Sequence, residues 1–225
     1  MRVVWLKHFR SFFYKSLKSV LYPLIVCALC SVAGEALNAV NVHVAFDGFE
    51  GDYPLIPIRT QAGPAKIAFV NFREDCAIVS AASKALAKKF PNDIDVLVTL
   101  GDQSNGLAML LASQTNLPLV VLTSKPTPGE VAFALPYASI TSGSKEMFIS
   151  KRQVQAIHNK KILLGDDVIS TGGSMQTALK LCQQAGATVQ GVFCVCTEGT
   201  PRSSFDGLPL LRLFHFPVQT DSTTS

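Results

Sequence analysis

Charged side chains are scarce in this sequence of 225 residues, and the segment 19–34 has none of either sign. Asp, Glu, Lys and Arg make up 16% of the chain, whereas hydrophobic residues make up 48%. This balance excludes a disordered protein, and the charges still interrupt the chain too often for a polytopic membrane protein. A chain of 225 residues can bury one sizeable core but leaves little room for a second. We therefore expect one globular domain with an apolar appendage.

Acidic residues are absent from the first 34 positions, which contain five basic ones. Beyond them the chain has 15 basic and 16 acidic residues, a net charge of −1. A domain without a basic excess gives no electrostatic reason to expect binding of DNA or RNA. The basic excess belongs to the amino-terminal extension alone.

The extension resembles a secretory signal peptide, with a basic start, an apolar run and the small residues Ser31 and Ala33 near a cleavage site after Ala33. The uncharged run of 16 residues is short for a membrane-spanning helix, which needs about 18–20. An uncleaved membrane anchor and an organellar transit peptide remain alternatives, and membrane contact is expected only through residues 1–34, if these are retained. The predicted boundaries are 1–39 for the extension, 40–219 for the domain and 220–225 for a polar tail.

Metal-binding and nucleophilic patterns are also missing. The four histidines are isolated in sequence and have no zinc-ligand spacing. Core packing is the simplest role for Cys182, Cys194 and Cys196. No Ser-His-Asp arrangement stands out, so we expect neither a metal held by protein ligands nor a covalent nucleophile.

Hydrophobic periodicity alternates between strand and helix through most of the domain. Strands are expected at 40–46, 94–100, 119–122, 162–164 and 189–195, and helices at 74–90, 105–113 and 171–185. Pro54 and Pro57 are expected to end the first β-segment, and 123–150 to form a loop or an irregular hairpin that often covers a site. Short loops between alternating elements predict an α/β fold: a single Rossmann-like domain whose parallel sheet is flanked by helices.

The segment 162–174 carries the clearest chemical signal. A buried strand is followed by Asp166 and Asp167, and then by a hydroxyl- and glycine-rich loop that begins a helix. The N–H groups and positive dipole end of a helix N-terminus favour a phosphate, and glycines let the backbone approach it. Paired carboxylates suit vicinal sugar hydroxyls. The pattern therefore predicts a site for a ribose 5-phosphate, and a capped turn with two exposed acids is the simpler alternative.

This segment resembles the phosphoribosyl-pyrophosphate motif of the type I phosphoribosyltransferases, and from 42 to 218 the order of segments is similar to their adenine-phosphoribosyltransferase-like, purine branch. The resemblance implies that Asp166 and Asp167 hold the ribose hydroxyls and that Lys125 joins them in catalysis. It implies a flexible lid at 139–149. The implied 5-phosphate site consists of Ser170, Thr171, Gly172, Gly173 and Ser174. The implied pyrophosphate loop, within 100–106, uses Gly101, Asp102, Gln103, Asn105 and Gly106.

The activity implied by this resemblance is Mg²⁺-dependent transfer of ribose 5-phosphate from phosphoribosyl pyrophosphate to a nucleobase, with the metal held mainly by substrate and water. A homodimer is also implied. Gln103 and Asn105 depart from the family, which often has an acidic and then a basic residue at these places. A non-catalytic sensor of phosphoribosyl pyrophosphate or nucleotide is therefore the alternative. The extension suggests export or membrane anchoring, whereas the supply of this substrate suggests the cytoplasm.

Overall fold

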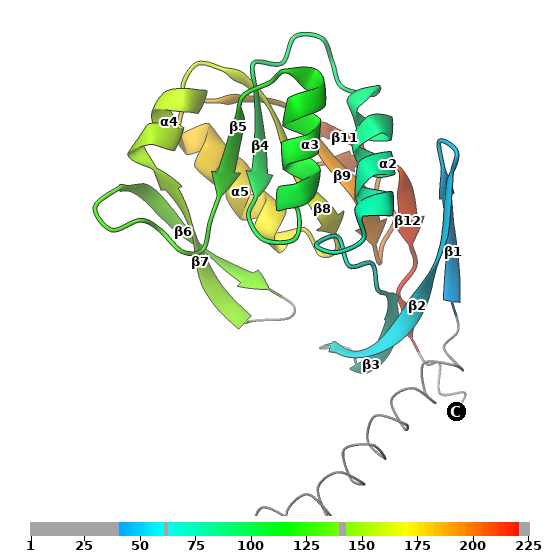
Figure 1. The fold of residues 1–225 in the computed structure, drawn as a ribbon. Coiled ribbons are helices and arrows are strands. Elements are labelled where there is room, and N and C mark those ends of the chain that lie inside the picture. Colours follow the sequence, from blue (N-terminus) through cyan, green and yellow to red (C-terminus); the bar gives the residue numbers. More distant parts are fainter. Residues whose placement is uncertain (1–40, 61–62, 140–142, 221–225) are drawn as a thin grey trace, which may run out of the picture. The chain divides into compact units, whose positions relative to one another are not determined.

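The computed structural model describes residues 41–60, 63–139 and 143–220, and the predictions for 1–39 and 221–225 lie outside them. Strands and helices alternate along much of this range (Figure 1). The helices are α2 (Cys76–Ala87), α3 (Asn105–Thr115), α4 (Lys151–Ile157) and α5 (Gly173–Gln184). The strands are β1 (Asn41–Phe46), β2 (Phe49–Thr60), β3 (Gly63–Ala68), β4 (Val96–Leu100), β5 (Leu119–Leu122), β6 (Val131–Ser139), β7 (Gly143–Ser150), β8 (Lys161–Ile169), β9 (Thr188–Glu198), β10 (Ser204–Phe205), β11 (Leu208–Leu211), β12 (Phe214–Phe216) and β13 (Gln219–Thr220).

The largest sheet has β5, β4, β8 and β9 as successive parallel neighbours. Strands β11 and β12 both run parallel to β9, and β10 pairs with β11 in the antiparallel sense. All five residues of β4 are buried, as expected for a strand covered on both faces. Val98 packs in a core cluster with residues of α5, whereas Leu97 packs with residues of α2 and α3. Helices thus cover both faces, which confirms the predicted α/β fold.

The first three strands and β13 form a separate antiparallel sheet in the order β1-β2-β3-β13. The prediction that Pro54 and Pro57 end the first β-segment is wrong, because β2 continues to Thr60. Its first half pairs with β1 and its second half with β3. Each half therefore has one edge without a partner strand. At such an edge a proline, which lacks an N–H group, costs no hydrogen bond to a neighbouring strand.

The segment after β5 folds as the hairpin β6–β7, the second of the two predicted alternatives. Its residues Met147 and Ile149 are buried in the core cluster that contains α5. Helix α4, which the periodicity did not reveal, begins at a capping box formed by Ser150 and Gln153. No helix in the described ranges has the length and apolarity needed to cross a membrane.

Candidate functional site

The predicted site residues follow three neighbouring parallel strands. The segment 101–106 follows β4, Lys125 follows β5, and 166–174 spans the end of β8 and the start of α5. The carboxyl ends of parallel strands lie at one edge of a sheet, which is where α/β proteins bind ligands. The topology therefore brings these separate segments to one edge (Figure 1).

Asp166 and Asp167 lie inside β8 rather than after it, because the pairing of β8 with β9 continues to Ile169. Their carboxyl groups lie close together, and the Asp167 N–H donates to Asp166 Oδ1 at 3.0 Å. Burial raises the pKa of both groups, and the negative charge of Asp167 raises the pKa of Asp166 further. Two adjacent carboxyl groups of this kind can accept hydrogen bonds from two neighbouring hydroxyls.

The loop after β4 is held tightly against β5. The Gly101 N–H donates to the Leu122 carbonyl at 2.7 Å, and a Cβ on Gly101 would lie 2.9 Å from that oxygen. Asp102 then adopts φ of 114°, a backbone conformation that is rare outside glycine. Ser104, which is not among the predicted loop residues, is buried, and its hydroxyl donates to the Leu100 carbonyl and accepts from Thr99 Oγ1 at 3.0 Å. Ser104 therefore holds the loop against the end of β4, close to the Asp166 carboxyl group.

A basic side chain from another part of the chain lies against this loop. Arg73, in the segment between β3 and α2, forms an ion pair with Asp102. The Arg73 side chain is 54% exposed, and its backbone N–H donates to the Asn71 side chain at 3.2 Å. Sequence reasoning missed Arg73, since its approach to Asp102 depends on how the segment before α2 packs beside the sheet.

The predicted phosphate loop leads directly into α5. Gly172 precedes the helix with φ of 87°, and no side chain caps the first turn. The backbone N–H groups of Gly173 and Ser174 belong to the group that a helix cannot satisfy internally, and they lie at its positive dipole end. The loop thus has the features of an anion-binding helix terminus.

A pocket of about 510 Å³ opens on this loop. Residues 171–173 line one side, and the segment after β9 contributes Arg202 and Phe205. Arg202 Nη2 donates to the Ser170 carbonyl at 2.7 Å, and its guanidinium carbon lies 5.7 Å from the centroid of the Phe205 ring. No motif in the sequence indicated this cation beside the phosphate loop.

Two other side chains at this edge were also missed. Glu198, the last residue of β9, lies close to Ser170, and burial raises the pKa of its carboxyl group. Burial raises the pKa of the Tyr137 phenol on β6, and the nearby charges of Asp102 and Asp166 raise this pKa further. Glu198 could have been identified because it ends the strand beside β8. The place of Tyr137 depends on the fold of the hairpin.

Lys125 lies at the same edge with an exposed side chain, and its backbone N–H donates to Thr123 Oγ1 at 2.9 Å. Within the described residues its side chain makes no hydrogen bond or ion pair with another group, so its catalytic role stays a prediction. The predicted lid corresponds to β7 and the turn before it, of which 140–142 lie outside the description. Among the described side chains, no three His, Cys, Asp or Glu residues gather as metal ligands.

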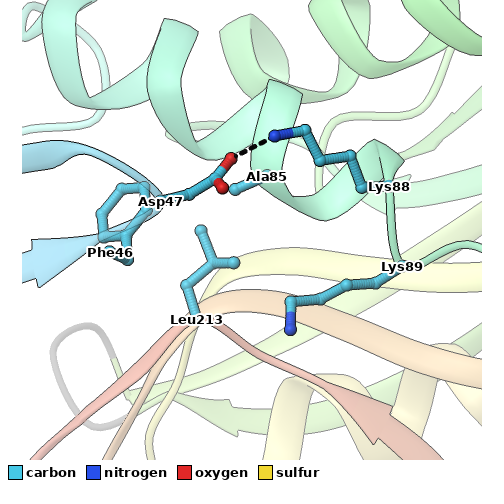
Figure 2. Close-up of a pocket in the computed structure, with 6 residues that line it drawn as sticks. All are labelled: Phe46, Asp47, Ala85, Lys88, Lys89 and Leu213. Carbon is cyan, nitrogen blue, oxygen red and sulfur yellow. Dashed lines mark hydrogen bonds and ion pairs between the residues drawn. The ribbon is translucent and has the colours of Figure 1, made fainter.

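A second pocket, of about 330 Å³, lies at the far end of α2 (Figure 2). Its Lys88 forms an ion pair with Asp47 at 2.7 Å, and Lys89 and Leu213 complete part of its wall. The 12 residues of α2 rise by about 18 Å, which separates this pocket from Arg73 at the start of the helix. The pocket contains none of the predicted site residues.

Residues 74–209 match the family model described as the phosphoribosyl transferase domain. The chain belongs to this family. It is 30% identical over 141 residues to the adenine phosphoribosyltransferase of Hydrogenovibrio crunogenus, covering 62% of this chain and 78% of the relative. It is 26% identical over 125 residues to the hypoxanthine/guanine phosphoribosyltransferase of Methanocella paludicola, covering 55% of this chain but only 62% of that relative.

Solved phosphoribosyltransferases share the fold. The adenine phosphoribosyltransferase of Thermoanaerobacter pseudethanolicus superposes with a TM-score of 0.58 at 18% identity, covering 72% of this chain and 95% of that one. The adenine phosphoribosyltransferase of Trypanosoma brucei, in complex with AMP, pyrophosphate and ribose 5-phosphate, superposes with a TM-score of 0.54 at 19% identity, covering 67% and 70%. The resemblance to the purine branch of this family is confirmed.

Proposed function

We propose that this phosphoribosyltransferase transfers ribose 5-phosphate from phosphoribosyl pyrophosphate to a purine base and releases pyrophosphate. The observation that carries the proposal is the succession of Asp166 and Asp167, the loop 170–172 and the start of α5 at the carboxyl edge of the sheet. Asp166 and Asp167 offer acceptors for a diol, and the start of α5 offers N–H donors for a phosphate. These groups match the two ends of one ribose 5-phosphate. The relatives named for adenine and for hypoxanthine and guanine support a purine and leave its identity to experiment.

Each end of the sugar has a counterpart in the chain. The ribose hydroxyls donate hydrogen bonds to Asp166 and Asp167. These hydrogen bonds stabilise the charged carboxylates, which burial disfavours in the ligand-free protein. The 5-phosphate accepts from the N–H groups at the start of α5, with Arg202 alongside. A hydrogen bond to a charged group contributes about 1.5–3 kcal/mol, so several together fix the sugar firmly.

The reaction breaks the bond between C1 of the ribose and a pyrophosphate oxygen, and the bonding electrons leave with pyrophosphate. A ring nitrogen of the purine forms the new bond to C1 and loses its proton to solvent. An oxocarbenium-like transition state needs no covalent nucleophile from the protein. The chain contributes by orienting the sugar, and Tyr137 on the hairpin helps to exclude water from C1.

Divalent metal enters this proposal with the substrate. Mg²⁺ prefers oxygen ligands and keeps several waters, and it neutralises charge on the diphosphate when bound. The carboxyl oxygens of Asp166 and Asp167 fit such an ion as additional ligands, with the rest supplied by substrate and water. In the chain itself, the Asp167 N–H orients the Asp166 carboxyl group.

A sensor without turnover is the second candidate function, and the composition of the pyrophosphate loop favours it. Gln103 and Asn105 bring no positive charge to the place where pyrophosphate would leave. Such a protein would bind phosphoribosyl pyrophosphate without releasing pyrophosphate. It would therefore respond to the ligand through a conformational change or a partner.

Pyrophosphate release by the full-length chain separates these functions. The assay supplies Mg²⁺ and phosphoribosyl pyrophosphate with adenine, hypoxanthine or guanine, and uracil and orotate serve as negative controls. The matched control protein carries Asp166→Asn and Asp167→Asn, which keep side-chain size. Release with a purine, lost in the control protein, supports the enzyme and identifies its base. Binding of phosphoribosyl pyrophosphate without release supports the sensor, and absence of both overturns both functions.

A further inference from the structure

The pyrophosphate side of the proposed site has an unbalanced charge, and this inference rests on the proposed function. Residues 101–106 contain Asp102 and no basic residue. Pyrophosphate carries several negative charges, and a like charge beside it is unfavourable at short range. A pyrophosphate that binds here therefore needs a cation from outside the loop.

Arg73 is a basic side chain that the fold places against this loop. It reaches Asp102 from the segment between β3 and α2. Its guanidinium group has five N–H donors, a geometry that suits phosphate oxygens. Apart from the contact with Asp102, these donors make no hydrogen bond to another group in the described part of the chain. Arg73 thus has donors left for a ligand.

The backbone around Arg73 is well anchored. Asn71 accepts the Arg73 N–H, and Asp75 accepts the N–H groups of Ala77 and Ile78 as the N-cap of α2. The Tyr53 hydroxyl also donates to Asp75 at 2.9 Å. Arg73 therefore extends from a fixed base toward the loop, which limits the ordering needed when a ligand binds.

The ion pair between Arg73 and Asp102 is itself weak enough to open. Both side chains are largely exposed, at 54% and 74%, and solvent screens such pairs strongly. A phosphate offers a guanidinium two parallel charge-assisted hydrogen bonds. A bound diphosphate can therefore compete for Arg73, or share it with Asp102.

We propose that Arg73 contacts the diphosphate of phosphoribosyl pyrophosphate and so supplies the positive charge that the pyrophosphate loop lacks. Asp102 holds the guanidinium over the loop before the substrate arrives. Arg73 then gives the site a cation, although residues 101–106 include no basic side chain. This assignment removes the main argument for the sensor over the enzyme.

Binding of two ligands that differ in the diphosphate tests the assignment. Calorimetry on the full-length chain measures the affinity for pyrophosphate with Mg²⁺ and, separately, for ribose 5-phosphate. Arg73→Ala should weaken pyrophosphate binding by about tenfold or more, as expected for loss of a charge-assisted hydrogen bond. It should change ribose 5-phosphate binding less than about twofold. Arg73→Lys should fall between Arg73→Ala and the wild type, because it keeps the charge without the planar donor pair.

Lys88→Ala is the matched control, because it removes an exposed ion pair at the opposite end of α2. It should leave both affinities unchanged. Asn105→Arg in the Arg73→Ala background places a cation in the loop itself and should restore pyrophosphate binding to within about threefold of the wild type. This rescue would not occur if Arg73 only maintained the local structure.

The outcomes separate the two proposals. Unchanged pyrophosphate affinity in Arg73→Ala, beside a wild type that binds it, overturns the role of Arg73 and leaves the proposed function standing. Equal weakening of both ligands, without rescue by Asn105→Arg, also overturns it as a structural effect. If the wild type binds neither pyrophosphate nor phosphoribosyl pyrophosphate, the proposed function fails together with this inference.

Discussion

The ring of Phe193 occupies the space that a side chain at Gly165 would need. The two residues are direct neighbours on β9 and β8, and a Cβ on Gly165 would overlap the ring. Phe193 is 1% exposed, and its ring centroid lies 5.2 Å from that of Phe90. Gly165 immediately precedes Asp166, so this packing lies directly beside the start of the aspartate pair.

Gly165→Ala should therefore destabilise the protein by overpacking. We expect the free energy of unfolding to fall by about 1–3 kcal/mol, the usual cost of an extra methyl group in a filled core. Phe193→Leu alone should also destabilise, because it leaves space beside Gly165. Combined, the two substitutions should cost less than the sum of their separate effects.

Urea denaturation of the four proteins in this cycle measures the coupling between the two positions. The slope of unfolding free energy against urea should stay constant, which would show that the native state remains compact. Strictly additive effects would mean that the side chains at the two positions do not interact. The proposed steric relationship would then be wrong.

The sequence predicts the elements that depend on local pattern. Strand β5 was predicted with its observed bounds, and the segment 162–174 indicated both a strand and an anion-binding helix start. The extent of β8 was missed, because its pairing with β9 carries the strand through Asp166 and Asp167. Pro54 was misjudged for a related reason: the tolerance of a proline depends on which edge of the strand has a partner.

The parts of the site that were missed come from segments far apart in the chain. Arg73 meets Asp102, and Arg202 meets Ser170, only after the helices and the carboxyl-terminal strands have packed. No periodicity or motif records such a meeting. Glu198 is different, since the end of a strand beside β8 is a place that topology alone marks as functional.

The aspartate pair should make the ligand-free protein less stable as the pH rises. The pKa of Asp166 is raised above its ordinary value of 3.8, so the folded state binds this proton more tightly than the unfolded state. Its favourable contribution is fully present below pH 3.8 and is lost as the pH rises through the higher pKa of the folded state. Asp166→Asn removes the cost of burying this charge, so it should raise the melting temperature at pH 7.5 by a few degrees while abolishing binding of phosphoribosyl pyrophosphate.

Thermal melts of the wild type and Asp166→Asn between pH 4.5 and 8 check this sign. The difference in melting temperature between Asp166→Asn and the wild type should increase with pH. Asp93→Asn is the control: Lys161 lowers the pKa of Asp93, so its stabilising contribution is complete above pH 3.8 and lost only in stronger acid, and the difference between Asp93→Asn and the wild type should stay constant from pH 4.5 to 8. If the difference in melting temperature between Asp166→Asn and the wild type became smaller as the pH rises, the assignment of a buried carboxyl pair that keeps its proton would be wrong.

Arg202 should contribute to the phosphate site both as a hydrogen-bond donor and as a charge, and two substitutions separate these effects. Arg202→Gln keeps an N–H donor that can reach toward the Ser170 carbonyl but removes the charge, whereas Arg202→Ala removes both. Loss of the charge should weaken ribose 5-phosphate binding by about tenfold in either variant. Only Arg202→Ala should also lower the melting temperature, because it leaves the Ser170 carbonyl without its side-chain donor.

Ligand choice distinguishes this role from a general effect on the fold. Ribose, which lacks the phosphate, should bind equally weakly to all three proteins, and high salt should narrow the difference between wild type and Arg202→Gln because a charge interaction is screened. If Arg202→Gln binds ribose 5-phosphate as tightly as the wild type, the guanidinium holds the loop without contacting the phosphate. The backbone N–H groups at the start of α5 would then account for the affinity, and Arg202 would be a positioning residue for Ser170.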